Sequence, residues 1–145
     1  MDSKVTRRSL LLFGSGVACA HALGCGGPTG GGSDVPTTLS AGSASALKAG
    51  TLESVSGYAV AIARDSAGVY ALSLVCTHQG CAMTNDASAY GIVCGCHGSV
   101  FDAQGNVLRG PATQALPHFA VTVDASGQLT IHTDQMVLSS TRLSA

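Results

Sequence analysis

Two short segments of this chain, residues 76–81 (CTHQGC) and 94–99 (CGCHGS), carry side chains that can bind a transition metal. Each segment presents one Cys and one His at the spacing of metal ligands, with a second Cys beside them. Two Cys and two His form the ligand set of a 2Fe–2S centre in which thiolates hold one iron and imidazoles the other. This interpretation makes the chain a carrier of single electrons, and the rest of the sequence serves to position the two segments.

A single tetrahedral zinc ion is the main alternative, because Cys-x-His followed by Cys-x-x-His can also bind zinc. One zinc ion would leave Cys81 and Cys96 without a role. The glycines of the two segments let the backbone approach the site closely and direct its N–H groups at inorganic sulfides. The hydroxyl of Ser99 can donate to a sulfide as well. These features favour a cluster, and a zinc-stapled binding module is the non-redox alternative.

The segments that must position these ligands have the pattern of β-strands. Four runs are rich in β-branched, aromatic and other apolar residues, namely 58–63, 69–75, 119–123 and 128–132. Three turn sequences begin with an Asp that can bond to the turn backbone and end with a Gly that can adopt a positive φ, at residues 65–68, 102–105 and 124–127. No convincing helix interrupts these runs. We expect an all-β, antiparallel domain with the two metal-binding segments as loops on a small hairpin sub-lobe.

The composition supports this fold class and excludes one kind of partner. The chain has 145 residues, of which 19 are Gly and none is Trp, and this suits a loop-rich β protein better than a helical bundle. Residues 39–145 are long enough for one modest core. The formal net charge is −1 and only 10% of the residues are charged. Because the sequence has no basic patch, we expect no nucleic-acid partner.

The N-terminal segment, residues 1–25, has the features of an export signal. Arg7 and Arg8 directly precede an apolar run, residues 10–23, which is too short to span a membrane but fits a signal sequence. The twin arginine is similar to that of a Tat signal, which exports folded proteins. An ordinary secretory signal with two incidental arginines is the alternative.

Cys25 is a candidate for lipidation. Residues 22–25 (ALGC) resemble a bacterial lipobox, although an Ala occupies the position where Leu is commonest. The Gly-rich residues 26–38 predict a flexible linker between the signal segment and a domain at 39–145. The alternatives are ordinary cleavage a few residues earlier, or an uncleaved helix that anchors the chain in a membrane.

The two metal-binding segments resemble the two cluster-binding boxes of Rieske iron–sulfur proteins. The resemblance continues through residues 101–105 (FDAQG) and 109–112 (RGPA), which are similar to the stretch that leads to the family's proline loop. It covers roughly residues 51–132. It implies a Rieske-type antiparallel β sandwich whose small sub-lobe binds one 2Fe–2S cluster with two loops.

The family pattern also implies a role for each candidate ligand. Cys76 and Cys94 are expected to bind one iron. His78 and His97 are expected to bind the other, and Ser99 to donate a hydrogen bond to the cluster.

A disulfide between Cys81 and Cys96 is a further implication of the resemblance. This pair is present in the respiratory and photosynthetic members and in the small subunit of arsenite oxidase. It is typically absent from the ferredoxins of cytosolic oxygenases. An exported protein can form such a disulfide, which would fix the two loops over a small core.

Two residues beside the boxes depart from the pattern of the respiratory members. Phe101 stands where high-potential members have a Tyr that donates a hydrogen bond, so we expect an intermediate-to-high reduction potential below that of a homologue with both donors. Gln79 stands where respiratory members usually have Leu, and a polar residue weakens the expectation that quinol docks there. Each ligating His keeps one ring nitrogen free, which can couple electron uptake to proton uptake.

The sequence thus predicts an electron-transfer subunit, exported to the periplasmic side of a bacterial membrane and anchored through a lipid or an N-terminal anchor. The resemblance implies the iron–sulfur subunit of a quinol–cytochrome c reductase-like complex, with cytochrome b and a c-type cytochrome as partners and quinol as a candidate donor. The alternatives are the small subunit of an exported molybdenum oxidoreductase similar to arsenite oxidase, and a free-standing carrier. No nucleophile–base arrangement is visible, so we expect no separate catalytic site.

Several other residues that can do chemistry are expected to have structural roles. We expect His118 and His132 to be surface or strand-end residues and not ligands. Asp102 is expected to form its turn, and His21 lies in the signal segment. Residues expected to serve in packing or at the surface are Met83, Tyr90 and Met136.

Overall fold

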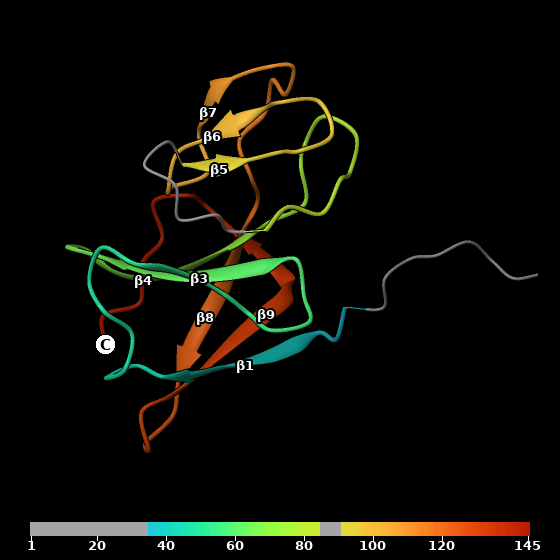
Figure 1. Ribbon diagram of the computed structural model, residues 1–145. Coiled ribbons are helices and arrows are strands. Elements are labelled where there is room, and N and C mark those ends of the chain that lie inside the picture. Colours follow the sequence, from blue (N-terminus) through green and yellow to red (C-terminus); the bar gives the residue numbers. More distant parts are fainter. Residues whose placement is uncertain (1–34, 85–90) are drawn as a thin grey trace, which may run out of the picture. The chain divides into compact units, whose positions relative to one another are not determined.

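Nine antiparallel strands make up the described part of the chain, which is residues 35–84 and 91–145 of a computed structural model. Six strands form a large sheet in the order β1-β9-β8-β4-β3-β2, with bounds β1 Thr38–Ser43, β2 Leu52–Ser54, β3 Val60–Asp65, β4 Gly68–Ser73, β8 His118–Val123 and β9 Gln128–Val137. Three form a small sheet in the order β5-β6-β7, with bounds β5 Ile92–Val93, β6 Val100–Phe101 and β7 Val107–Arg109. Figure 1 shows the small sheet lying over the large one. The predicted all-β antiparallel fold with a small sub-lobe is confirmed. Only the second metal-binding segment joins two strands of the small sheet, however, because the first follows β4 of the large sheet.

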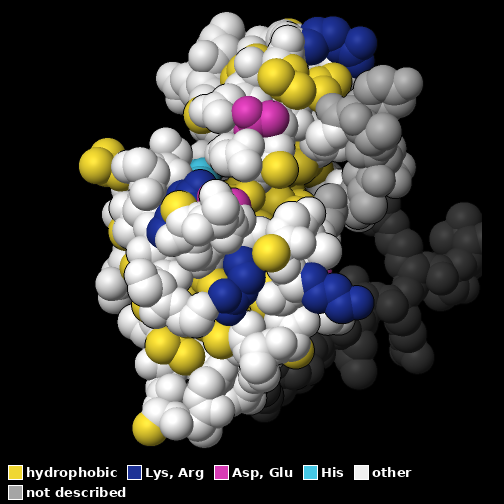
Figure 2. All heavy atoms as spheres, turned by 90° about the vertical axis from the view of Figure 1, so that its left-hand side faces the viewer, with side chains coloured by type: hydrophobic (Ala, Val, Ile, Leu, Met, Phe, Trp, Pro, Cys, Tyr) yellow, Lys and Arg dark blue, Asp and Glu magenta, His cyan; other side chains and the backbone are white. Residues whose placement is uncertain are grey.

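Some predictions concern residues outside this described part. They are the signal segment with its twin arginine and His21, the lipidation candidate Cys25, most of the linker at 26–38, and Tyr90. Within residues 35–84 and 91–145, no helix has the length and apolar character needed to cross a membrane. On the face of the molecule shown in Figure 2, the Lys and Arg side chains are few and lie apart from one another, and Asp or Glu side chains are present on the same face.

The three predicted Asp-to-Gly turns each close a hairpin, joining β3 to β4, β6 to β7, and β8 to β9. In each turn the Asp carboxylate accepts backbone N–H groups, and the Gly has a positive φ. Asp102, for example, accepts from the N–H groups of Gln104 (2.9 Å) and Asn106 (2.8 Å). The expectation that Asp102 forms its turn is therefore confirmed.

The buried apolar residues form two cores, because both faces of β3 and β4 are covered. Successive side chains of a strand point to opposite faces, so Tyr70 and Leu72 of β4 face one core and Val69 and Ala71 the other. This explains why the predicted run at 69–75 is apolar without alternation. The core that touches both sheets, here called the site core, consists of Ala61, Ala63, Tyr70, Leu72, Leu74, Cys76, Met83, Ile92, Cys94, Phe101, Ala112 and Leu116.

The C-terminal end of the chain returns to the large sheet, although its sequence has no strong strand pattern. β9 continues five residues beyond the predicted end at His132, so that His132 lies inside the strand and not at its end. After β9, Leu143 exchanges both backbone hydrogen bonds with Val69 of β4 (2.9 and 2.8 Å). Met136 is a surface residue, as expected, with 76% of its area exposed.

His118 begins β8, as expected of a strand-end residue, but it is buried, with only 2% of its area exposed. Its Nε2 atom lies 2.9 Å from the carbonyl oxygen of Gln104. A carbonyl oxygen can only accept, so Nε2 carries a proton and donates it in this hydrogen bond. The other nitrogen, Nδ1, is buried without a hydrogen-bond partner. The ring stacks on Tyr70, with 5.7 Å between the ring centroids.

We expect the protein to lose stability as the pH falls below about 6.5, because of His118. Burial lowers the pKa of His118 below its ordinary value of 6.5; the hydrogen bond to Gln104 opposes this shift, Arg142 adds repulsion, and Asp102 opposes it weakly. The unfolded chain therefore takes up a proton at a higher pH than the folded chain, which destabilises the folded state as the pH falls. Between roughly pH 8 and pH 5, the unfolding temperature should fall less in His118→Gln than in the unchanged protein. Equal pH dependence in the two proteins would contradict this assignment.

Candidate metal centre

The first loop, residues 76–81, continues the chain from β4 and is closed by two backbone hydrogen bonds. The N–H of Cys76 donates to the carbonyl oxygen of Cys81 (2.8 Å), and the N–H of Gly80 donates to the carbonyl oxygen of Cys76 (2.9 Å). Gly80 has a φ of 74°, a left-handed conformation that residues with a side chain rarely adopt. The glycine therefore makes the sharp turn that brings the two ends of the loop together.

The second loop, residues 94–99, joins β5 to β6 and repeats this turn. The N–H of Cys94 donates to the carbonyl oxygen of Ser99 (2.8 Å), and the N–H of Gly98 donates to the carbonyl oxygen of Cys94 (2.9 Å). Gly98 has a φ of 77°. Both loops thus begin with a Cys and place a left-handed Gly four residues later, while the His comes one position later in the second loop. The similar spacing in the sequence reflects two copies of one turn.

A disulfide between Cys81 and Cys96 joins the two loops, as the family resemblance implies. The Cα atoms of the pair are 6.6 Å apart. The sulfur atoms of Cys81, Cys94 and Cys96 all lie within 4.8 Å of one another. Because two of these sulfurs are bonded to each other, only Cys94 of this group is free to bind a metal. The disulfide therefore holds the loops together directly beside a candidate ligand.

The four candidate ligands, Cys76, His78, Cys94 and His97, meet in two pairs across the two loops: the Cys76 thiol hydrogen-bonds to Cys94, and His78 meets His97. Both Cys side chains are buried free thiols. The two His rings meet edge to face, with 4.8 Å between their centroids. His97 is exposed and His78 is half-buried. The thiols thus lie on the inner side of the site and the imidazoles on the outer side.

Hydrogen bonds favour the ionised form of the Cys94 thiol. Burial raises the pKa of this thiol, but hydrogen bonds from the Cys76 thiol and from the backbone N–H groups of Cys96 and His97 outweigh the burial. The pKa of Cys94 therefore lies below its ordinary value. Since the thiolate is the form that binds metals, the second loop favours the ligating state of Cys94.

The residues present fit a metal group that needs two sulfur and two nitrogen ligands. The Nδ1 atom of His78 is buried and has no hydrogen-bond partner, which is a cost that a metal bond would remove. Cys76 and Cys94 likewise have no disulfide partner. The disulfide uses Cys81 and Cys96, so Cys76 and Cys94 are the two free thiols among the described residues.

A third segment, residues 109–116, is fastened to both loops. Ser99 is fully buried, and its hydroxyl oxygen accepts the N–H of Ala112 (2.9 Å), which leaves the hydroxyl proton to donate elsewhere. The hydroxyl of Thr77 donates to the carbonyl oxygen of Gln114 (2.6 Å). The Nε atom of Arg109 donates to the carbonyl oxygen of Gly98 (3.2 Å), which ties this segment to the second loop a second time.

The sequence predicted Ser99 but not Thr77, Arg109 or Gln114. The acceptors in these contacts are backbone carbonyl groups, which every residue has, so no pattern of side chains marks them. The two residues that depart from the pattern of the respiratory members differ in burial. Phe101 is fully buried in the site core, and Gln79 is exposed next to His78.

Comparisons with known proteins agree with this geometry. A protein-family model described as the Rieske [2Fe-2S] domain matches residues 37–120. The chain is 45% identical over 69 residues to the cytochrome b6-f complex iron-sulfur subunit of Synechococcus elongatus, a match that covers 46% of this chain and 38% of that protein. It is 40% identical over 84 residues to the cytochrome b6-f complex iron-sulfur subunit 2 of Synechocystis, covering 57% of this chain and 42% of that protein.

The chain therefore spans about two fifths of the length of these curated relatives. Among solved structures, it is similar to the cyanobacterial plasma membrane Rieske protein from Synechocystis PCC 6803. The TM-score is 0.50 at 29% sequence identity, and the match covers 64% of this chain and 97% of that one.

Removing the disulfide should weaken the whole described domain. The sequence separation between Cys81 and Cys96 is 15. A disulfide across such a loop restricts the unfolded chain by about 3 kcal/mol, so the double variant Cys81→Ser, Cys96→Ser should lose about 3 kcal/mol of unfolding free energy in chemical denaturation. Reduction of the unchanged protein should produce a similar loss, whereas undiminished stability in both would show that the disulfide does not brace the loops.

Proposed function

We propose that this chain, which belongs to the Rieske [2Fe–2S] domain family, transfers single electrons through one 2Fe–2S cluster bound by the two loops. The observation that carries this proposal is the meeting of two buried thiols with two outward-facing imidazoles beside a loop-joining disulfide. A zinc module would need the same four ligands, but it would give no role to the hydroxyl proton of Ser99, which a cluster sulfide can accept.

Each candidate ligand has a defined task in this proposal. Cys76 and Cys94 hold one iron as thiolates, and His78 and His97 hold the other. The bound cluster supplies reversible one-electron chemistry. Because neutral imidazoles replace two thiolates, the site carries two fewer negative charges than a four-cysteine site, so that an electron is accepted more readily and the reduction potential is higher. The free hydroxyl proton of Ser99 can stabilise the reduced form further.

The exposure of the two imidazoles gives the electron its route to a partner. His97 is exposed and His78 is half-buried, whereas both thiols are buried. A redox partner can therefore approach the site from the imidazole side. A ligating imidazole also keeps one nitrogen free, so that proton uptake at these two residues would be coupled to electron uptake by the cluster.

The proposed setting is the iron–sulfur subunit of a quinol–cytochrome c reductase-like complex, with cytochrome b and a c-type cytochrome as partners. The names of the similar curated proteins, subunits of the cytochrome b6-f complex, support this setting. We place residues 39–145 on the periplasmic side of the membrane, with residues 1–25 as the export signal or anchor, Cys25 as a lipidation candidate and residues 26–38 as the linker.

One observation favours a second setting. Gln79 is an exposed amide directly beside His78. A polar side chain at this point suits a water-exposed protein–protein contact better than a quinol pocket within a membrane complex. The second candidate is therefore a small subunit of an exported molybdenum oxidoreductase, or a free-standing carrier, with the same cluster and the same ligands.

The spectrum of the purified full-length protein tests the cofactor and its ligands together. We expect iron and acid-labile sulfide in equal amounts, and an EPR signal of the reduced protein with the low average g value of a cluster that has two imidazole ligands. His97→Ala should abolish this signal, whereas His132→Ala, which changes a histidine on β9, should leave it intact. Bound zinc without iron, or the EPR signal of a four-cysteine cluster, would refute the proposal.

Phe101→Tyr should raise the reduction potential. Phe101 lies in the site core together with Cys76 and Cys94, and we expect a hydroxyl on its ring to donate to a sulfur of the site. A net hydrogen-bond energy of about 1 kcal/mol in favour of the reduced form corresponds to about 40 mV in a one-electron couple. Voltammetry of the variant measures this shift. The matched control is Phe119→Tyr, which adds the same hydroxyl beside the other core and should leave the potential unchanged.

A further inference from the structure

The four candidate ligands belong to two different sheets. Cys76 and His78 lie on the first loop, which continues β4 of the large sheet. Cys94 and His97 lie on the second loop, which joins two strands of the small sheet. The distance between the ligand pairs therefore depends on how firmly the small sheet is held against the large one.

The disulfide and the contact between Thr77 and Gln114 fix the two sheets at the loops themselves. A second attachment lies at the turn between β6 and β7. The hydroxyl of Tyr70, in β4, donates to the carbonyl oxygen of Ala103 (3.0 Å). The Nε2 atom of His118, at the start of β8, donates to the next carbonyl oxygen, that of Gln104 (2.9 Å). Two side chains of the large sheet thus hold two successive carbonyl groups of the small-sheet turn.

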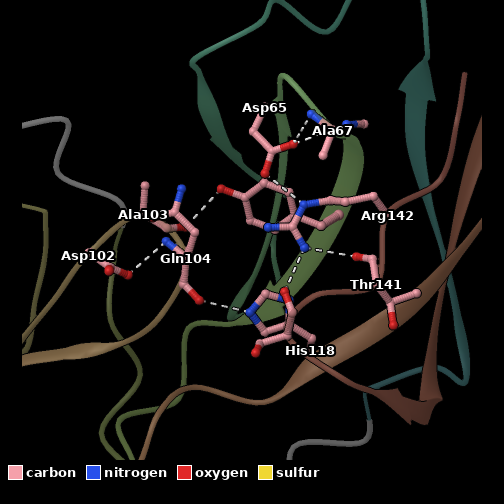
Figure 3. A network of polar contacts seen from close by, with 11 residues as sticks. Asp65, Ala67, Asp102, Ala103, Gln104, His118, Thr141 and Arg142 are labelled. Carbon is pink, nitrogen blue, oxygen red and sulfur yellow. Dashed lines mark hydrogen bonds and ion pairs between the residues drawn. The ribbon is translucent and has the colours of Figure 1, made fainter.

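These two donors are themselves held rigidly. Tyr70 and His118 are buried, with 4% and 2% of their areas exposed, and their rings are stacked with an interplanar angle of 16°. The guanidinium group of Arg142 lies 4.0 Å from the centroid of the Tyr70 ring. Arg142 is fixed in turn by an ion pair with Asp65 (2.7 Å), as Figure 3 shows. The donor pair therefore has little freedom to follow a moving turn.

The turn that accepts these bonds is equally rigid. Asp102 accepts three hydrogen bonds within it, two from Asn106 and one from Gln104, and part of this network is seen in Figure 3. Gly105 in the same turn accepts the N–H of Leu116 (2.9 Å), and a Cβ atom on this glycine would lie only 2.9 Å from the Cβ atom of Leu116. The turn thus moves as one block together with the end of the segment 109–116.

Three further connections from this block lead to the metal centre. β6 runs back from the turn to Ser99, the predicted hydrogen-bond donor. β7 runs forward to Arg109, which bonds to Gly98 of the second loop. The segment that ends at Leu116 contains Ala112, whose N–H bonds to the Ser99 hydroxyl. A displacement of the block is therefore transmitted to Ser99 and to the second loop.

We propose that Tyr70 and His118 are positioning residues for the cluster: by holding the turn at residues 102–105, they set the placement of the second loop and of Ser99 relative to the first loop. This inference rests on the proposed function, because it concerns the cluster that the loops bind. Loss of either donor releases one carbonyl group of the block. The β6–β7 hairpin can then tilt, so that Ser99 donates less well and the ligand pairs fit the cluster less closely.

The test uses Tyr70→Phe in the full-length, cluster-loaded protein, because this variant removes only the hydroxyl and keeps the ring on which Arg142 and His118 stack. We expect a lower reduction potential, a changed EPR line shape, and loss of the cluster to a chelator that is about fivefold faster, the factor that corresponds to one net hydrogen bond. His118→Phe, which keeps an aromatic ring without the donor, should act in the same direction. His118→Gln, whose amide can donate to the Gln104 carbonyl, should restore the potential towards that of the unchanged protein.

The matched control is Thr122→Val, which removes a side-chain hydrogen bond to His132 (2.9 Å) between β8 and β9, away from the small sheet. It should leave the potential and the EPR line shape unchanged. If Tyr70→Phe lowers the unfolding temperature but leaves the potential, the EPR line shape and the rate of cluster loss unchanged, the two residues serve the fold alone and the inference is wrong. If the unchanged protein has no two-histidine EPR signal, the proposed function fails instead, so the two failures are distinguishable.

Discussion

The constraint on which this structure depends is that one small metal group must be bound by two loops from two different sheets. Neither sheet can form the site alone, because each supplies one thiol and one imidazole. The site core satisfies part of this constraint, since residues of both sheets, among them Leu72 and Phe101, are buried in it together. Apolar packing has little directional preference, so the exact placement of the loops requires the disulfide and the hydrogen bonds described above.

The order of the ligands from the inside to the outside solves an electrostatic problem. A buried thiolate is costly unless hydrogen bonds compensate its charge. At Cys94 burial raises the pKa of the thiol, but hydrogen bonds from the Cys76 thiol and from the backbone N–H groups of Cys96 and His97 lower it below its ordinary value. The imidazoles of His78 and His97 lie nearer the solvent, because His97 is exposed and His78 is half-buried. In the proposed function, this arrangement would insulate the sulfur ligands and leave the electron a short path on the imidazole side.

The sequence predicted the features that depend on local chemistry. The Asp-to-Gly turns and the strand runs follow from neighbouring residues, and the structure contains both. It did not predict that His118 is buried or that Arg142 returns to the large sheet, because both depend on partners far away in the chain. It also missed Thr77, whose partner is a backbone carbonyl and leaves no trace in the sequence.

Phe101 shows how the packing constraint and the redox chemistry compete for one position. Its ring is fully buried in the site core, between residues contributed by both sheets. An apolar ring there adds packing between the sheets and leaves no polar group to satisfy, whereas a phenol would have to direct its hydroxyl at the metal centre or bury it at a cost. The chain therefore has a residue that favours the joining of the sheets. The proposed side-chain donor to the cluster is then Ser99, whose hydroxyl oxygen accepts the N–H of Ala112. Accurate placement of that one donor then matters more, which is why contacts as distant as those of Tyr70 and His118 can bear on the reduction potential.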